Sequence, residues 1–270
     1  MSTTRSICPK GPATDPGTGA GPAAEPGDAV ILCAHGVRAR PGIAEAHARA
    51  LEQRARYAAV RACCLFGTPD LATTVHSVDA ARIHVVPLLM ADGYTSRTAL
   101  PRAVARAMRE GRPLHVHPPV GLHPAMSELI RDQAHALCRA RGWAAETTAL
   151  VLAAHGSPRD SGSRQAAQQH AARLATSGTF ARVAAAFLEL APRVPVTIAR
   201  LTTAPDVAHV VVVGLFLDSG PHGRDDMATL LRPFGETVAY AGPIGTAPGF
   251  VDIIAAALAA GRGADADTAA

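Results

Sequence analysis

The sequence has few aromatic residues and few cysteines. The first shortage limits how the core can pack, and the second limits the sites that cysteines could form. One Trp, three Tyr and six Phe occur in 270 residues, whereas alanine is abundant. We therefore expect helices that pack closely through small side chains. The five cysteines form no CxxC pair, and three of them fall in predicted strands. This pattern favours reduced, mostly buried thiols and provides no cysteine cluster for an iron–sulfur centre.

Long apolar runs and dense blocks of positive charge are also lacking. No run approaches the ~18 residues that a membrane span requires, and no apolar signal segment opens the chain. We therefore expect a soluble, cytoplasmic protein without a membrane partner. The net charge of +4 is mild, and no Lys/Arg block carries interleaved aromatic residues, which argues against nucleic acid binding. Most of the positive charge is arginine, which suits either a solvated surface or a small polyanionic substrate.

Both ends of the chain lack apolar periodicity. Residues 1–27 consist mainly of Gly, Pro, Ala and Thr, and we predict that they are disordered, because they cannot bury enough surface to offset the entropy of ordering. Between the ends, eight short apolar runs alternate with helical patterns. This alternation predicts an α/β fold in which helices cover both faces of parallel sheets.

The order of the predicted elements repeats once. "VILCAHGVR" opens the first half and "LVLAAHGSPR" opens the second. "PPVGLHP" lies toward the end of the first half, and "GPIGTAP" toward the end of the second. We predict two duplicated domains over residues 28–146 and 147–262, each a four-stranded parallel sheet flanked by helices, facing each other across a cleft. Because the two repeats would supply both sides of that cleft, we expect a monomer.

Three side chains suited to metal or proton chemistry follow strands of the second half. His155 ends the first strand, Glu189 closes the second, and His222 lies in the loop after the third. Ligands bind beyond the carboxyl ends of parallel strands, so these side chains can converge. Two neutral imidazoles and a carboxylate suit a first-row divalent ion, and three protein ligands with an open position describe a reactive site. Taken singly, Glu189 could serve a helix N-terminus and His222 could be a solvated loop residue.

The first half keeps only one of these three residues. His35 matches the first histidine, but Gly67 falls roughly at the position of the glutamate and Thr95 at that of the second histidine. Tyr94, beside the last position, could stack or hydrogen-bond but cannot replace an imidazole. We therefore predict that the first half is a degenerate copy, in which His35 contributes only modestly.

Three further histidines lie in predicted helices. We expect His47, His135 and His170 on solvated helix faces.

The stretches "LVLAAHGSPRDSGSR", "VAAAFLELAPRVPVTI" and "HVVVVGLFLDSGPHGRDD" resemble the class II chelatases of the CbiX/SirB type, the sirohydrochlorin cobaltochelatases and ferrochelatases. The resemblance covers about residues 28–261 and is weaker in the first half. It implies insertion of a divalent metal into sirohydrochlorin or a related anionic tetrapyrrole without ATP, in cobalamin or siroheme biosynthesis. Cobalt is favoured over iron and nickel, and no cofactor beyond this metal substrate is implied.

The resemblance also assigns roles to individual residues. His155 and His222 correspond to the metal-binding pair, and Glu189 to a carboxylate that contacts the substrate and assists metal delivery or proton removal. The loop that would cradle the macrocycle consists of Leu217, Asp218, Ser219, Gly220 and Pro221.

Other classes of protein could also explain the two strands that end in His-Gly. A histidine phosphatase needs an arginine just before the histidine, where Ala34 and Ala154 stand, and an α/β-hydrolase needs a G-x-S-x-G elbow, which the sequence lacks. The remaining alternative is a non-catalytic metal or tetrapyrrole carrier on the same scaffold, since a fold does not fix a function.

Overall fold

The computed structural model describes residues 27–36, 39–54, 57–108, 114–218 and 227–260. Apart from Gly27, the N-terminal segment predicted to be disordered lies outside these residues. The first half contains β1 (Ala29–Ala34), α1 (Ala44–Arg54), β2 (Ala59–Cys64), α2 (Leu71–His76), β3 (Ile83–Pro87), α3 (Leu100–Met108), β4 (Leu114–Val116) and α4 (Met126–Arg141). The second half contains β5 (Thr148–Ala154), α5 (Gly162–Thr176), β6 (Arg182–Phe187), α6 (Val194–Thr202), β7 (His209–Gly214), α7 (Met227–Leu231), β8 (Val238–Pro243) and α8 (Phe250–Ala259).

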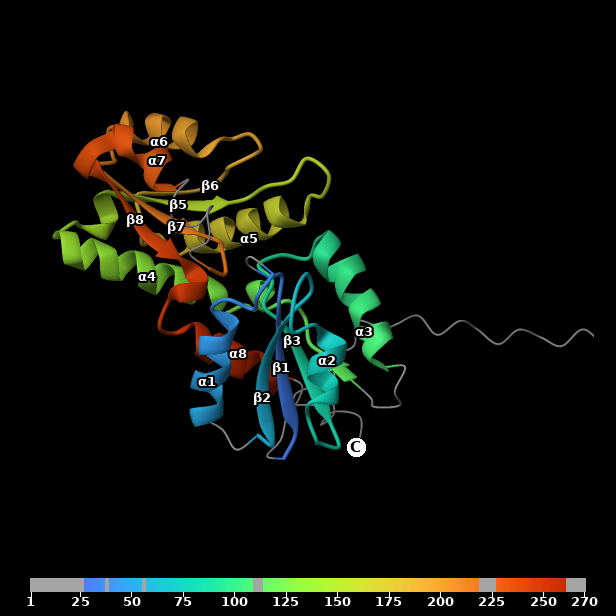
Figure 1. Cartoon of the computed structure of the whole chain (residues 1–270). Coiled ribbons are helices and arrows are strands. Elements are labelled where there is room, and N and C mark those ends of the chain that lie inside the picture. Colours follow the sequence, from blue (N-terminus) through green and yellow to red (C-terminus); the bar gives the residue numbers. More distant parts are fainter. Residues whose placement is uncertain (1–26, 37–38, 55–56, 109–113, 219–226, 261–270) are drawn as a thin grey trace, which may run out of the picture.

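The strands form two four-stranded parallel sheets with the same topology (Figure 1). The order is β2-β1-β3-β4 in one sheet and β6-β5-β7-β8 in the other. Every residue of β1 and of β5 is buried, as expected for strands covered on both faces. The predicted α/β fold with two duplicated sheets is confirmed.

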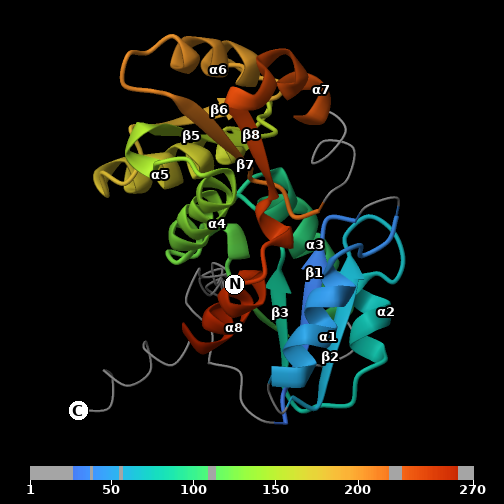
Figure 2. The same ribbon diagram turned by 90° about the vertical axis from the view of Figure 1, so that its left-hand side faces the viewer.

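The last helix of each half packs on the sheet of the other half. Helix α4 contacts β7 and β8, where Gln133 Nε2 donates to the carbonyl of Ala241 at 2.8 Å. Helix α8 contacts β3 and α1, and Arg54 of α1 forms an ion pair with Asp252 of α8. Figure 2 shows α8 beside the strands of the first sheet and α4 beside the second. One hydrophobic core therefore includes both halves, with Leu32 of β1 and Leu150 of β5 among its members.

None of the helices in the described part of the chain has the length and hydropathy of a membrane span.

The prediction of solvated helix histidines was wrong for two of the three. His47 and His170 are only 8% and 3% exposed, and each imidazole contacts a backbone carbonyl of the other repeat. His135 is partly buried, with the edge of its ring against Phe180. The residues around these histidines are small and polar, so the local pattern does not reveal that a distant turn covers two of the rings.

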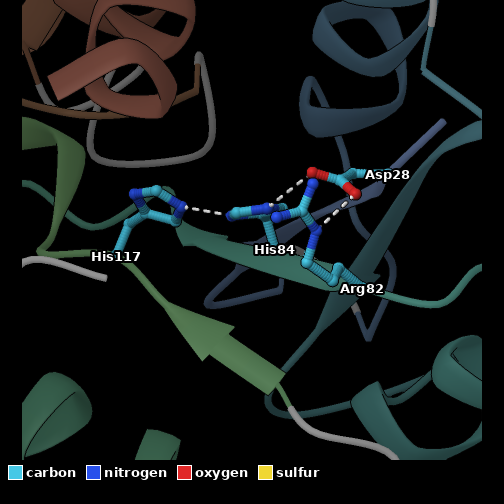
Figure 3. A network of polar contacts seen from close by, with 4 residues as sticks. All are labelled: Asp28, Arg82, His84 and His117. Carbon is cyan, nitrogen blue, oxygen red and sulfur yellow. Dashed lines mark hydrogen bonds and ion pairs between the residues drawn. The ribbon is translucent and has the colours of Figure 1, made fainter. Parts of the chain in front are cut away.

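A chain of polar contacts crosses the amino ends of β1 and β3 (Figure 3). The carboxylate of Asp28 accepts from Arg82 Nε at 2.9 Å and lies 3.2 Å from Nε2 of His84. Nδ1 of His84 lies 2.9 Å from Nε2 of His117. Burial lowers the pKa of His84, although Asp28 acts in the opposite direction. Burial, and secondly the neighbouring His84, lower the pKa of His117 to about 4.

This cluster makes the stability of the fold sensitive to acid. The pKa values of His84 and His117 are lowered in the folded chain, whereas after unfolding both imidazoles return to the ordinary value of 6.5. Between pH 6.5 and about 4 the unfolded state therefore binds more protons, so the free energy of unfolding should fall as the pH is lowered through this range. We expect His117 alone to account for up to about 3 kcal/mol.

Urea unfolding at a series of pH values measures this loss. His117→Gln removes the titrating ring and should flatten the dependence, while the matched variant His76→Gln, at an exposed helical position, should keep the full slope. An unchanged slope in His117→Gln would show that His117 does not carry the effect.

Candidate active site

Two of the three residues predicted to form the site lie together at the carboxyl edge of the second sheet. His155 follows β5 directly, and Glu189 stands two residues after β6. Nε2 of His155 is 3.4 Å from Oε1 of Glu189, and the two side chains are 44% and 51% exposed. An imidazole and a carboxylate at this separation, open to solvent, can exchange a proton or share a divalent cation.

The backbone around this pair explains the His-Gly sequence. The amides of Leu188 and Glu189 both donate to the carbonyl of His155, at 3.2 and 3.1 Å, and so fix the turn after β6 against the end of β5. Gly156 has a φ of +72°, and a Cβ there would lie 3.0 Å from Cβ of Phe187. A larger residue would strain the backbone and press on the strand that carries Glu189.

The third predicted ligand, His222, lies outside the described residues, as do Ser219, Gly220 and Pro221. Leu217 and Asp218, which begin the predicted cradle, are described. Oδ2 of Asp218 accepts a hydrogen bond from the amide of Ile43 at 3.0 Å, so this carboxylate contacts the start of α1 in the first repeat. Across the described residues, no group of three or more His, Cys, Asp or Glu is arranged to hold a metal ion.

In the first repeat, an aromatic ring replaces the carboxylate. The amide of Phe66 donates to the carbonyl of His35 at 3.2 Å, which is the bond that Glu189 makes to His155. Phe66, and not Gly67, therefore occupies the position of Glu189, and the sequence alignment was wrong by one residue. The rings of His35 and Phe66 are in contact, with centroids 4.8 Å apart, and burial lowers the pKa of His35.

The alignment error has a physical cause. The two loops differ in sequence after their second strands, and only the hydrogen bonds to the neighbouring strand fix the register. The asymmetry between the repeats remains as predicted, because a phenyl ring can neither bind a cation through a lone pair nor accept a proton.

Known proteins that are similar to this chain include a probable chelatase and proteins of the CbiX/SirB type. The chain is 25% identical over 264 residues to a probable sirohydrochlorin cobaltochelatase of Halobacterium salinarum, covering 84% of this chain and 89% of that protein. It is 27% identical to the solved structure of CbiX, described as the terminal enzyme for biosynthesis of siroheme in denitrifying bacteria, with a TM-score of 0.67 over 86% of this chain and 98% of that one.

A third relative supports the fold alone. SirB from Bacillus subtilis, solved with Fe3+, is 18% identical, with a TM-score of 0.73 over 88% of this chain and 98% of that one. The CbiX family model matches residues 29–137 and 149–260, once in each repeat. Since these matches cover most of the sequence, the protein belongs to the CbiX family.

Proposed function

We propose that this protein inserts a divalent metal ion into sirohydrochlorin or a closely related anionic tetrapyrrole. The observation that carries the proposal is the contact between His155 and Glu189 at the carboxyl edge of the second sheet, in a chain of the CbiX family. The relative from Halobacterium salinarum, named a probable sirohydrochlorin cobaltochelatase, supports the substrate and favours cobalt, with iron and nickel as the other candidate metals.

The reaction requires a ligand for the metal substrate and an acceptor for protons. The ion must lose water before it enters the macrocycle, and two pyrrole nitrogens must each lose a proton to form the four metal–nitrogen bonds. In the proposal, His155 and His222 hold the ion through imidazole nitrogens. Glu189 accepts a pyrrole proton, and a histidine released from the ion can accept another. No step consumes ATP.

Arginines near the histidine suit the acidic substrate. Arg159 stands four residues after His155, and Arg164 lies in the first turn of α5; both are exposed. A guanidinium pairs with a carboxylate through two parallel hydrogen bonds, and a helix N-terminus favours negative charge. In the proposal these groups bind peripheral carboxylates, while residues 217–221 contact the macrocycle. The protein acts as a monomer in the cytoplasm, without nucleic acid or membrane.

Metallation of sirohydrochlorin by the purified protein tests the proposal. Sirohydrochlorin in excess over protein is incubated with Co2+, Ni2+ or, without oxygen, Fe2+, and its absorption spectrum is followed. We expect many turnovers with cobalt, and no dependence on ATP. Conversion that stops at one equivalent per chain would instead identify a carrier, and no conversion with any of the three metals would refute a chelatase.

Replacing Glu189 tests its role in proton transfer. Glu189→Gln keeps the shape of the side chain but cannot accept a proton, so kcat should fall about 10- to 100-fold while the KM for the metal changes little. The matched variant Glu236→Gln changes an exposed glutamate just before β8, at the opposite edge of the sheet, and should behave as wild type. Equal rates for both variants would exclude Glu189 as a proton acceptor.

A further inference from the structure

One buried histidine of each repeat contacts a backbone carbonyl of the other repeat. Nε2 of His47 in α1 lies 2.8 Å from the carbonyl oxygen of Gly245, in a turn that follows β8. Nε2 of His170 in α5 lies 2.8 Å from the carbonyl oxygen of Gly121, in the turn that follows β4. Because a carbonyl only accepts, both ring nitrogens donate a proton. The two contacts are equivalent under the duplication, since both glycines occupy the same place in "PPVGLHP" and "GPIGTAP".

Both glycines are clamped against the segment that follows the third strand of their own repeat. The amide of Gly245 donates to the carbonyl of Phe216 at 3.0 Å, and a Cβ at 245 would lie 2.0 Å from the carbonyl oxygen of Leu217. In the first repeat, the amide of Gly121 donates to Leu89 at 2.9 Å, and a Cβ there would lie 2.3 Å from Cα of Met90. Each histidine therefore fixes the turn at its glycine, and that turn fixes the loop that follows the third strand of the same repeat.

In the second repeat, a side chain of this loop also binds the backbone of the other half. Asp218 accepts from the amide of Ile43, directly before α1, and its charge also faces His47. The first repeat has Ala91 at the equivalent position, four residues after Pro87 as Asp218 is four after Gly214. The start of α1 thus holds Phe216–Asp218 through a side chain that the other loop lacks.

We propose that α1 of the first repeat positions the segment Phe216–Asp218, which leads to the proposed metal ligand His222, with His47 acting through Gly245 and the amide of Ile43 acting through Asp218. This inference rests on the proposed function of His222, which the sequence reaches four residues after Asp218. His47 is a positioning residue in this proposal, because its ring is buried against the turn at Gly245 and acts on the loop only through that turn. The first repeat, which lost its own carboxylate, keeps a role in metal binding as the support of the intact site.

The duplication supplies a matched pair of variants. His47→Ala and His170→Ala each remove one buried imidazole and one 2.8 Å contact to a glycine carbonyl. His170 also accepts from the hydroxyl of Ser127, so His170→Ala should lower Tm at least as much as His47→Ala does. The two variants differ in the loop that they affect: His47→Ala should loosen the loop after β7, and His170→Ala the loop after β3. Amide hydrogen exchange and Co2+ affinity, measured by competition with a chromophoric chelator, separate positioning from general stability.

For His47→Ala we expect exchange in peptides covering residues 214–218 to become at least threefold faster, and the Kd for Co2+ to rise about 5- to 10-fold. For His170→Ala we expect both quantities to stay within twofold of wild type and exchange to accelerate around residues 88–92 instead. His47→Gln retains an N–H donor and should restore most of the affinity.

Two results would overturn the inference: unchanged exchange over residues 214–218 in His47→Ala, or an equal loss of Co2+ affinity in His170→Ala. Failure of the proposed function is recognised separately. In that case the wild-type protein either binds Co2+ without metallating sirohydrochlorin or does not bind Co2+. The exchange comparison still decides whether α1 holds the loop. If His47→Ala does not fold, exchange in Asp218→Ala, with Asp218→Asn as the variant that keeps an acceptor for Ile43, gives the same decision.

Discussion

Replacing His155 with alanine should lower the rate of metal insertion at least about 100-fold, whereas His35→Ala should lower it no more than about threefold. The reason is the difference between their neighbours. His155 faces the carboxylate of Glu189 at 3.4 Å, while His35 packs on the ring of Phe66. In the proposed site, water would replace the imidazole of His155 as a ligand of the metal substrate. Removing His35 only reshapes a surface, because Phe66 stands at the position of the glutamate and, among the described residues, no carboxylate pairs with His35.

The measurement is the initial rate of sirohydrochlorin metallation for both variants and wild type, with circular dichroism to confirm that each is folded. Equal damage from the two substitutions would mean that the repeats share one site, and the assignment of the first repeat as a degenerate copy would fail.

Gly121→Ala should lower the free energy of unfolding by about 3 kcal/mol or more and lower Tm by roughly 6–12 °C. A Cβ at this position would lie 2.3 Å from Cα and 2.6 Å from the carbonyl carbon of Met90. Both are backbone atoms, so no side chain can rotate away, and the turn that carries the contact to His170 must shift instead.

Gly142→Ala is the control for this effect. Gly142 has a φ of +67° at the end of α4 but nothing within 4 Å of its would-be Cβ, so alanine there carries only the conformational cost of about 1 kcal/mol. Thermal unfolding of both variants separates steric overlap from backbone strain. A similar Tm for the two would show that the turn at Gly121 adapts.

The sequence was sufficient to predict features that depend on local pattern. Alternating apolar runs predict both sheets, and the convergence of strand ends predicts that His155 and Glu189 lie together, as they do. Register is different, because it depends on hydrogen bonds between strands. A one-residue shift separated Gly67 from Phe66, the residue that stands where the second repeat has its carboxylate.

Features that depend on distant partners could not be predicted at all. The carbonyl that accepts from His47 belongs to Gly245, 198 positions away, so a buried imidazole and a solvated one look alike in the sequence of α1. In the same way, the amphipathic patterns of α4 and α8 show that each helix buries a face but not which sheet covers it.

The exchange of α4 and α8 between the sheets makes each half incomplete by itself. A chain cut between Gly142 and Thr147 would yield two pieces, each carrying a helix that covers the other piece's sheet and each leaving its own sheet partly bare. An ancestor with a single repeat would have met this need by pairing with a second copy through swapped helices. Joining the copies in one chain removes the requirement that both be identical. One partner could then lose its acid without losing its place in the assembly, which is the state in which His35 and Phe66 are found.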